Sequence, residues 1–334
     1  MVTLQDIADK VGVSKGTVSK ALNGAPDVSE AMQKSVLETA IAMGYTKIRR
    51  MKTPTKKLCM LIENMEYEKI HHFGYDFIVG FKLLAEPAGF LVDVLPIDDK
   101  LQKSIPYDVF MLQNNYAGAF ILGLTLNDPW MKDFKTCKTP TVLYDNYVKA
   151  NPYVSSIGID NTEGMELAVS YLKSLGHKNI GYLSSALGSY IMQVRFQAFL
   201  SAMRSSGLKV DNGHTGVSYY ISECLQKHLP RFLNSGITAV ICSHDQIAIA
   251  AMMECRQLGC SIPDDISFIG FDDLPVSAYA QPPLTSVRQD RIELGKCGFS
   301  ALSSIFDQVA IGTILLHARL IIRESTGKIN KNRI

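Results

Sequence analysis

The chain has 334 residues, of which 47% are hydrophobic and 20% are charged, as in globular proteins with a sizeable core. This length suits two or three domains. No stretch approaches the ~20 apolar residues of a membrane span, and the first residues form no apolar leader, so we expect a cytoplasmic protein.

The charge is distributed unevenly along the chain. The net charge is +2, but residues 1–57 carry ten Lys and Arg against five Asp and Glu, which leaves 24 against 27 in the remainder. A basic N-terminal segment on a mildly acidic body predicts a polyanionic partner for that segment alone.

The cysteines favour neither disulfides nor a metal centre. Their number is odd, none forms a CxxC pair, and several stand inside apolar runs, so we expect reduced, buried thiols. His71 and His72 lack a third ligand at a usable spacing. We therefore predict no metal and no cofactor. The seven positions are Cys59, Cys137, Cys224, Cys242, Cys255, Cys260 and Cys297.

The segment from Thr3 to Gly24 predicts two short helices joined by a tight turn. Thr3 caps the first helix and Asp6 completes a capping box. Gly12 supplies the turn, and Ser14 caps the second helix. Apolar residues recur at helical spacing at Leu4, Ile7, Ala8, Val11, Val18, Ala21 and Leu22.

The outward face of the second helix is small, basic and rich in hydroxyl groups. Such a face fits the major groove of DNA. A helical hairpin inside a larger core has the same spacing, so both interpretations remain open here. The residues of this face are Lys15, Gly16, Thr17, Ser19 and Lys20.

A third helix and a basic linker complete the first part of the chain. Met32, Val36, Ala40 and Met43 predict a helix that ends at Gly44–Tyr45, so that residues 1–45 form a compact headpiece. Residues 46–57 hold six positive charges and no acid. This stretch is either a solvated linker or a segment that neutralises DNA phosphates.

From Leu58 onward, strands and helices alternate in two successive runs. This alternation predicts an α/β fold of two doubly wound parallel sheets, and ligands of such folds bind at the carboxyl ends of the strands. We expect strands at 58–63, 90–96, 117–124, 140–145, 155–160, 179–184, 215–217, 238–243 and 266–271. We expect helices at 75–88, 161–175, 192–206, 224–233, 246–258 and 290–311.

Three of these strands end on polar side chains. Asp160 follows one strand, His244 and Asp245 follow another, and Asp272 and Asp273 follow a third. Each carboxylate could instead cap the next helix. Three such ends on one edge favour a ligand pocket.

A cation is predicted beside these strand ends. Arg195 stands on a helix that is otherwise apolar, and a buried Arg needs a partner such as Asp272. Carboxylates, an Arg and nearby aromatic rings suit a polyhydroxylated ligand.

The amino-acid sequence resembles those of LacI-family transcriptional regulators over almost the whole length of the chain. The headpiece resemblance rests on TLQDIADKVGVSKGTVSKALNG. In the core it rests on GIDNTEG (158–164), LGHKNIGYL (175–183), MQVRFQAF (192–199), HDQIAIAAM (244–252), IPDDISFIGFDD (262–273), PPLTSVRQD (282–290) and LIIRESTG (320–327).

The resemblance implies a helix–turn–helix headpiece on a periplasmic-binding-protein-like core, a homodimer, and a small-molecule effector between the subdomains. The effector contacts of the family correspond to Asp160, Arg195, Asp272 and Gln289. Aromatic contacts fall at Phe73 or Tyr75 and at Tyr219 or Tyr220. The family usually has Asn where this chain has His244, which precedes Asp245, and a His side chain is bulkier and titrates near neutral pH.

For DNA, we expect Lys15, Gly16 and Lys20 to decide the sequence that is read, and Thr17 and Ser19 to contact phosphates. The resemblance also implies a hinge helix after the headpiece. The linker is, however, about four residues shorter than in the family and lacks the family's usual hinge sequence. Met51 is the nearest counterpart of the apolar residue that the family inserts into the minor groove. The remaining expected DNA contacts are Thr3, Ser14, Asn23, Ser29, Arg49 and Arg50.

The same resemblance implies a division of the chain into a headpiece, a hinge and two subdomains. We assign residues 58–175 and 288–317 to the first subdomain, and 176–287 and 318–327 to the second. The chain is thus expected to cross near Leu175 and return near Val287. The tail, 328–334, is too short and polar for a tetramer-forming helix.

The sequence therefore predicts a DNA-binding repressor of a pseudo-palindromic operator, controlled by a small molecule for which we expect a sugar. A purine co-repressor is the alternative among regulators. A carbohydrate-binding protein without regulatory function is the alternative from another class. We do not expect an enzyme, because the chain has no GxxxxGK[ST], no GxGxxG after a strand and no GxSxG.

Overall fold

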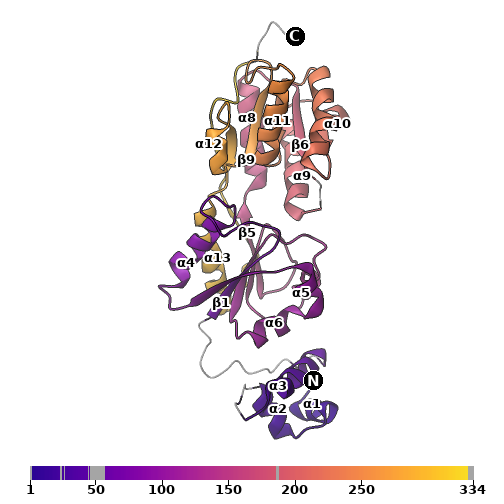
Figure 1. Cartoon of the computed structure of the whole chain (residues 1–334), viewed down its shortest axis with the longest axis vertical. Helices are drawn as coiled ribbons and strands as arrows, with labels where there is room; N and C mark the ends of the chain where they lie inside the picture. The colour runs from indigo at the N-terminus through magenta and orange to yellow at the C-terminus, as the bar shows by residue number, and fades with distance from the viewer. Residues whose placement is uncertain are drawn as a thin grey trace.

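The computed structural model describes residues 2–22, 25, 27–43, 45, 57–185 and 188–329. It contains a small helical headpiece and two α/β subdomains, which follow one another along the molecule (Figure 1). Within these residues, no helix combines the length and the apolar character needed to cross a membrane.

The headpiece consists of α1 (Leu4–Val11), α2 (Lys15–Leu22) and α3 (Glu30–Ala42). The predicted capping box is confirmed, because the Thr3 side chain accepts a hydrogen bond from the Asp6 backbone and the Asp6 side chain accepts one from the Thr3 backbone. Gly12 ends α1 with a left-handed φ of 77°, the conformation that glycine adopts at least cost. The core of the headpiece is formed by Ile7, Ala8, Val18, Ala21, Val36 and Ala40.

The first subdomain contains a six-stranded sheet whose paired strands all run parallel. The strands are β1 (Lys57–Ile62), β2 (Leu91–Pro96), β3 (Gly118–Leu122), β4 (Thr141–Tyr144), β5 (Val154–Ile159) and β11 (Thr313–Leu316). Their order in the sheet is β11-β5-β4-β3-β1-β2.

The second subdomain repeats this arrangement with one antiparallel strand. Its strands are β6 (Ile180–Ser184), β7 (Thr215–Val217), β8 (Ala239–Cys242), β9 (Ser267–Asp272), β10 (Thr285–Arg288) and β12 (Arg319–Ile321), in the order β12-β10-β9-β8-β6-β7. Only the pairing of β10 with β12 is antiparallel among the described pairs. The predicted fold class is confirmed, with β12 as an added edge strand.

Helices cover both faces of each sheet. In the first subdomain these are α4 (Tyr75–Ala85), α5 (Asp99–Ser104), α6 (Tyr107–Gln113), α7 (Trp130–Asp133) and α13 (Arg291–Phe306). In the second they are α8 (Asn161–Ser174), α9 (Tyr190–Ser205), α10 (Ile221–Asn234), α11 (Asp245–Gln257) and α12 (Pro275–Tyr279), together with a 3-10 turn at Asn212–His214.

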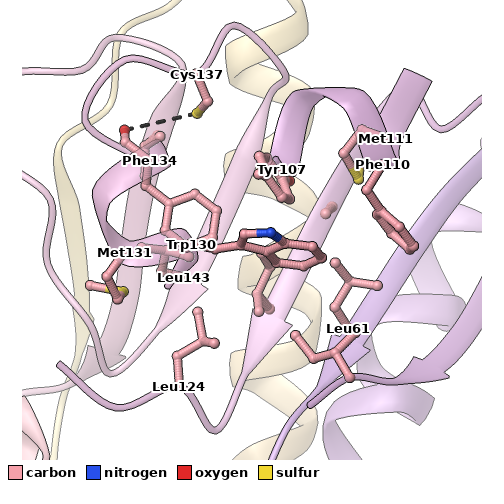
Figure 2. Close-up of a cluster of buried hydrophobic side chains, with 14 of the residues drawn as sticks. Leu61, Tyr107, Phe110, Met111, Leu124, Trp130, Met131, Phe134, Cys137 and Leu143 are labelled. Carbon is pink, nitrogen blue, oxygen red and sulfur yellow. Dashed lines mark hydrogen bonds between the residues drawn. The ribbon is translucent and has the colours of Figure 1, made fainter. Parts of the chain in front are cut away.

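Aromatic side chains fill one face of the first sheet. Trp130 is fully buried, and its ring lies 5.3 Å from that of Tyr107 and 5.4 Å from that of Phe110. Figure 2 shows these rings between the short helices and the strands. The Trp130 indole N–H donates to the Ile105 carbonyl, so its polar atom is satisfied.

On the opposite face, α4 crosses α13 with their backbones in close contact. A Cβ added at Gly80 would lie 2.0 Å from the Ile292 carbonyl oxygen, and one at Gly295 would lie 2.3 Å from the Phe77 carbonyl oxygen. Only glycine fits at this crossing, so the two helices behave as one packed unit.

The chain passes between the subdomains three times, after β5, after β10 and between β11 and β12. The predicted return near Val287 agrees with the change of sheet after β10. The predicted crossing near Leu175 is wrong, because α8 already packs on the second sheet. Its buried residues Met165, Ala168, Val169 and Leu172 share a core with Ile180 and Tyr182 of β6. We propose the boundary at Asp160.

The larger elements match their predicted positions within a few residues. The exceptions are short or atypical. Helices α5, α6, α7 and α12 have four to seven residues each, too few for a periodic pattern. The last long helix ends at Phe306 and not at 311, and Gln308 follows it with a φ of 63°.

Candidate functional site

The headpiece presents the predicted DNA-facing residues on the exposed side of α2. Lys15, Gly16 and Lys20 are exposed, and Thr17 and Ser19 are half-buried. Their outward position agrees with a surface that could enter a groove, while Val18 and Ala21 on the opposite side are buried in the headpiece core.

Hydrogen bonds fix the hydroxyl groups around this face. The Ser14 Oγ accepts from the Thr17 N–H at 3.0 Å and shares a hydrogen bond with its hydroxyl at 2.8 Å. The Ser29 Oγ accepts from the Met32 N–H at the start of α3. Lys20 forms an ion pair with Asp27. Of the remaining expected contacts, Thr3 is exposed at the α1 cap, whereas Asn23, Arg49, Arg50 and Met51 lie outside the described residues.

A second group of predicted residues gathers where the two sheets face each other, around Arg195 of α9. This side chain is only 2% exposed. It donates to the Asn161 Oδ1 at 2.8 Å and to the Ser243 carbonyl at 2.7 Å, and forms an ion pair with Asp272 at 3.2 Å. The guanidinium also lies over the Phe271 ring at 3.8 Å. The predicted Arg195–Asp272 pair is confirmed.

Asp272 links this pair to the first subdomain. Its Oδ1 accepts from the Gln289 amide at 2.6 Å, and the Gln289 Oε1 accepts from the Tyr144 hydroxyl at 2.8 Å. Tyr144 belongs to β4 and Asp272 to β9. Gln289 therefore connects the two sheets at their carboxyl ends.

Phe73 lies beside this network, and Tyr75 begins the neighbouring helix α4. The Phe73 ring is 6.5 Å from the Tyr144 ring and 5.5 Å from the Arg291 guanidinium. Both Phe73 and Tyr75 are half-buried. An aromatic surface thus lies close to the polar network.

Three atoms around the site are buried without a hydrogen-bond partner. They are the Oδ1 of Asp145, which directly follows β4, the Nδ1 of His244, the second residue after β8, and the Oγ of Ser243, the first residue after β8. Burial raises the pKa of Asp145 to about 6 and lowers that of His244 to about 4. Near pH 7.5 the first is an ionised acceptor and the second a neutral ring with one N–H.

Asp245 does not face this site, although we predicted an effector contact. Its side chain is 0% exposed. Its Oδ1 accepts from the Ser286 hydroxyl at 2.6 Å, and its Oδ2 accepts from the Leu274 N–H and the Ser277 hydroxyl, each at 2.7 Å. Both oxygens are therefore used inside the second subdomain, and the prediction is wrong because the carboxylate holds the loop after β9.

Three other predicted residues stand apart from the network. Asp160 caps α8 by accepting from the Thr162 and Glu163 N–H groups at 2.9 and 3.0 Å, which agrees with the alternative interpretation as a helix cap. Tyr219 and Tyr220 are 72% and 66% exposed and contact each other edge to face. The structure does not bring these two rings to Arg195.

Several residues of the site escaped the sequence analysis. Asp145 ends a predicted strand, so the rule used for Asp160 and Asp272 would have found it. Asn161, Ser243 and Arg291 have no such signal, since they contribute through hydrogen bonds between distant segments. Asp273 pairs with Arg288 and Arg323, an arrangement that sequence spacing does not reveal.

Comparisons with known proteins identify both parts of the chain. Residues 3–47 match the family model described as bacterial regulatory proteins, lacI family. Residues 169–326 match the model of a periplasmic binding protein-like domain. The chain is therefore similar to LacI-family regulators in both of its parts. The predicted helix–turn–helix regulator with a periplasmic-binding-protein-like core is confirmed.

Relatives of this family match over nearly the entire chain. The transcriptional repressor CytR of Escherichia coli K12 is 27% identical over 332 residues, which cover 97% of this chain and 96% of CytR. The chain is thus a DNA-binding transcriptional regulator, as predicted, and this relative carries the name of a regulator and not of an enzyme.

Two solved structures show the same fold. A complex of the transcriptional regulator CelR with cellobiose superposes with a TM-score of 0.71 at 23% identity, covering 97% of this chain and all of CelR. The lac repressor dimer bound to operator and the anti-inducer ONPF gives 0.66 at 24% identity, covering 98% of this chain and 99% of the other.

Proposed function

We propose that this LacI-family regulator represses transcription by binding a pseudo-palindromic operator as a homodimer. A C2 dimer presents two headpieces and reads two half-sites. The exposed α2 face and the basic residues 46–57 supply the groups for base and phosphate contacts. The operator-bound lac repressor dimer, which shares this fold, supports the arrangement. The regulator acts in the cytoplasm, and it has no catalytic activity of its own.

The operator affinity is controlled by a neutral, polyhydroxylated effector bound between the two subdomains. The observation that carries this proposal is the pair of unpartnered buried atoms, Asp145 Oδ1 and His244 Nδ1, because buried polar atoms in native proteins are nearly always satisfied. They follow strands of different sheets. A ligand that binds both would bridge the subdomains and favour one closure angle.

The charges of the site favour a neutral ligand over a phosphorylated one. The charge of Arg195 is already paired with that of Asp272, and its guanidinium donates to two further acceptors. Asp145 adds a negative charge without a counterion in hydrogen-bond contact. A phosphate group would therefore meet a carboxylate and find no free cation there, whereas hydroxyl groups can donate to it. The CelR–cellobiose complex is an example of a sugar on this fold.

Replacing Lys20 tests the DNA-binding part of the proposal. We expect the intact protein to select a pseudo-palindrome from random-sequence DNA, and Lys20→Ala to relax the consensus at one position in each half-site, because base contacts contribute about 1–3 kcal/mol of discrimination. Lys10→Ala changes an exposed lysine of α1 and is the matched control, which should select the same consensus as wild type. An unchanged consensus in Lys20→Ala would show that this side chain does not contribute to base recognition. Wild-type protein that selects no sequence would instead support a carbohydrate-binding protein without regulatory function.

Thermal shift tests the effector part. We expect cellobiose, D-ribose or cytidine to raise the Tm, since a ligand at 100 times its Kd adds about 2.7 kcal/mol to the stability of the native state. Asp145→Asn and His244→Ala should each need at least ~5-fold more ligand than wild type to reach the same Tm shift. His71→Ala, on the exposed loop before α4, should respond as wild type. A ligand that shifts all four proteins equally binds elsewhere, and fructose 1-phosphate should give no shift.

A further inference from the structure

Arg291 joins three segments that come from both subdomains. It is the first residue of α13, where the chain has just returned from the second sheet. Its Nη2 and Nε lie 3.1 and 3.3 Å from the Asp76 Oδ2 of α4. Its Nη1 donates to the Asp272 carbonyl at 3.2 Å, and its guanidinium lies beside the Phe73 ring.

The acceptor on the second subdomain is an unusual one. Asp272 has a φ of 103°, a conformation that is unfavourable for a residue with a side chain and persists only where the surroundings hold it. Arg291 binds the carbonyl of this residue, while Arg195 and Gln289 bind its carboxylate. The end of β9 is therefore fixed partly by α13 and α4.

Arg288, three residues earlier, offers a direct contrast. It pairs with Asp273 at 2.6 Å, and both residues belong to the second subdomain. Its side chain is 44% exposed, whereas that of Arg291 is 9% exposed. Arg288 thus forms an ion pair within the second subdomain, whereas Arg291 forms one with Asp76 of α4 in the first subdomain.

Helix α4 connects this contact with β1. Phe77 and Phe81 of α4 share a buried core with Leu58 and Met60 of β1, and β1 is the first strand after the basic linker. A change in the position of β9 would be transmitted to α4 through Arg291. Packed side chains would then transmit it from α4 to β1.

We propose that Arg291, oriented by Asp76, is a positioning residue that ties the end of β9 to α4 and thereby couples the effector site to operator binding. The inference rests on the proposed function. It assigns the coupling to one buried contact between the subdomains, in addition to the ligand contacts.

A double-mutant cycle on the full-length protein tests this assignment. The operator is the sequence that wild-type protein selects, and its Kd is measured by fluorescence anisotropy for wild type, Arg291→Met, Asp76→Asn and the double variant. We expect each single substitution to change the Kd at least ~5-fold in the same direction, the lower end of usual coupling effects. The double variant should change it no further, because both substitutions break the same contact.

Two controls separate coupling from loss of structure. Arg288→Met also removes an ion pair from this segment, and its operator Kd should stay within ~2-fold of wild type. Arg291→Lys, which keeps the charge toward Asp76, should restore part of the Kd change. Single-variant Kd values within ~2-fold of wild type, or effects that add in the double variant, would overturn the proposal. If wild type selects no operator, the proposed function fails first.

Discussion

Arg195→Met should lower the free energy of unfolding by about 3–5 kcal/mol, the usual cost of leaving a buried charge without its partner. The substitution leaves Asp272 with the Gln289 amide but without its ion pair, and it removes the donors from the Asn161 Oδ1 and the Ser243 carbonyl. Urea unfolding followed by circular dichroism measures the loss. The cation–π contact with Phe271 is lost as well.

Matched variants isolate the effect of the network. Arg204→Met changes an exposed arginine at the end of the same helix and should shift the unfolding free energy by less than ~0.5 kcal/mol. Arg195→Met combined with Asp272→Asn removes both charges and should recover part of the loss. A decrease below ~1 kcal/mol in the single variant would contradict the structural role of Arg195.

The structural role of Arg195 determines which substitutions can test the effector site. A failed effector response in an Arg195 variant would report a damaged interface between the subdomains as readily as a lost ligand contact. Asp145 and His244 are better probes, because each holds a buried atom that has no protein partner to lose. Substituting them should change ligand binding more than stability.

The sequence could predict the parts of the site that depend on charge and on strand order. Arg195 and Asp272 were paired because a buried guanidinium needs a counterion, and Asp272 follows an apolar strand. Gln289 and Phe73 came from the resemblance to the family. All four lie in or beside the network of the structure.

The sequence could not predict which strand-end carboxylates belong to the site around Arg195. Asp145, Asp160 and Asp245 each stand at or near the end of a strand, yet one is unpartnered, one caps α8 and one holds a loop. The difference depends on where Leu274, Ser277 and Ser286 lie around Asp245. Those positions follow from tertiary packing, which the local pattern does not contain.

The same limit explains the error at α8. Its pattern predicts a helix correctly, but a helix between β5 and β6 can pack on either sheet. The buried face with Met165 and Val169 fits the second sheet, and no residue spacing distinguishes the two alternatives. Short elements such as α7 were missed because one turn of helix has no periodicity to detect.

Asp245→Ala should be the second strongly destabilising substitution, with a loss of about 4 kcal/mol in the free energy of unfolding. The truncation leaves a buried backbone N–H and two buried hydroxyl groups without their acceptor, and each such group costs ~1–3 kcal/mol when unsatisfied. Asp245→Asn keeps the shape and one acceptor oxygen, so its loss should be smaller. Equal stabilities of the alanine variant and wild type in urea would refute the role given to this carboxylate.

The pH dependence of stability provides an independent check on Asp245. Burial raises the pKa of this carboxyl from 3.8 to about 7 in the folded protein, so between these values the folded state binds more protons than the unfolded chain. The contribution of Asp245 to the free energy of unfolding should therefore fall as pH rises from about 4 to about 7, and stay constant above that range. Asn does not titrate, so Asp245→Asn should compare better with wild type at pH 8 than at pH 5. A stability difference between the two proteins that is the same at both pH values would show that the carboxylate is ionised throughout, held by its three donors.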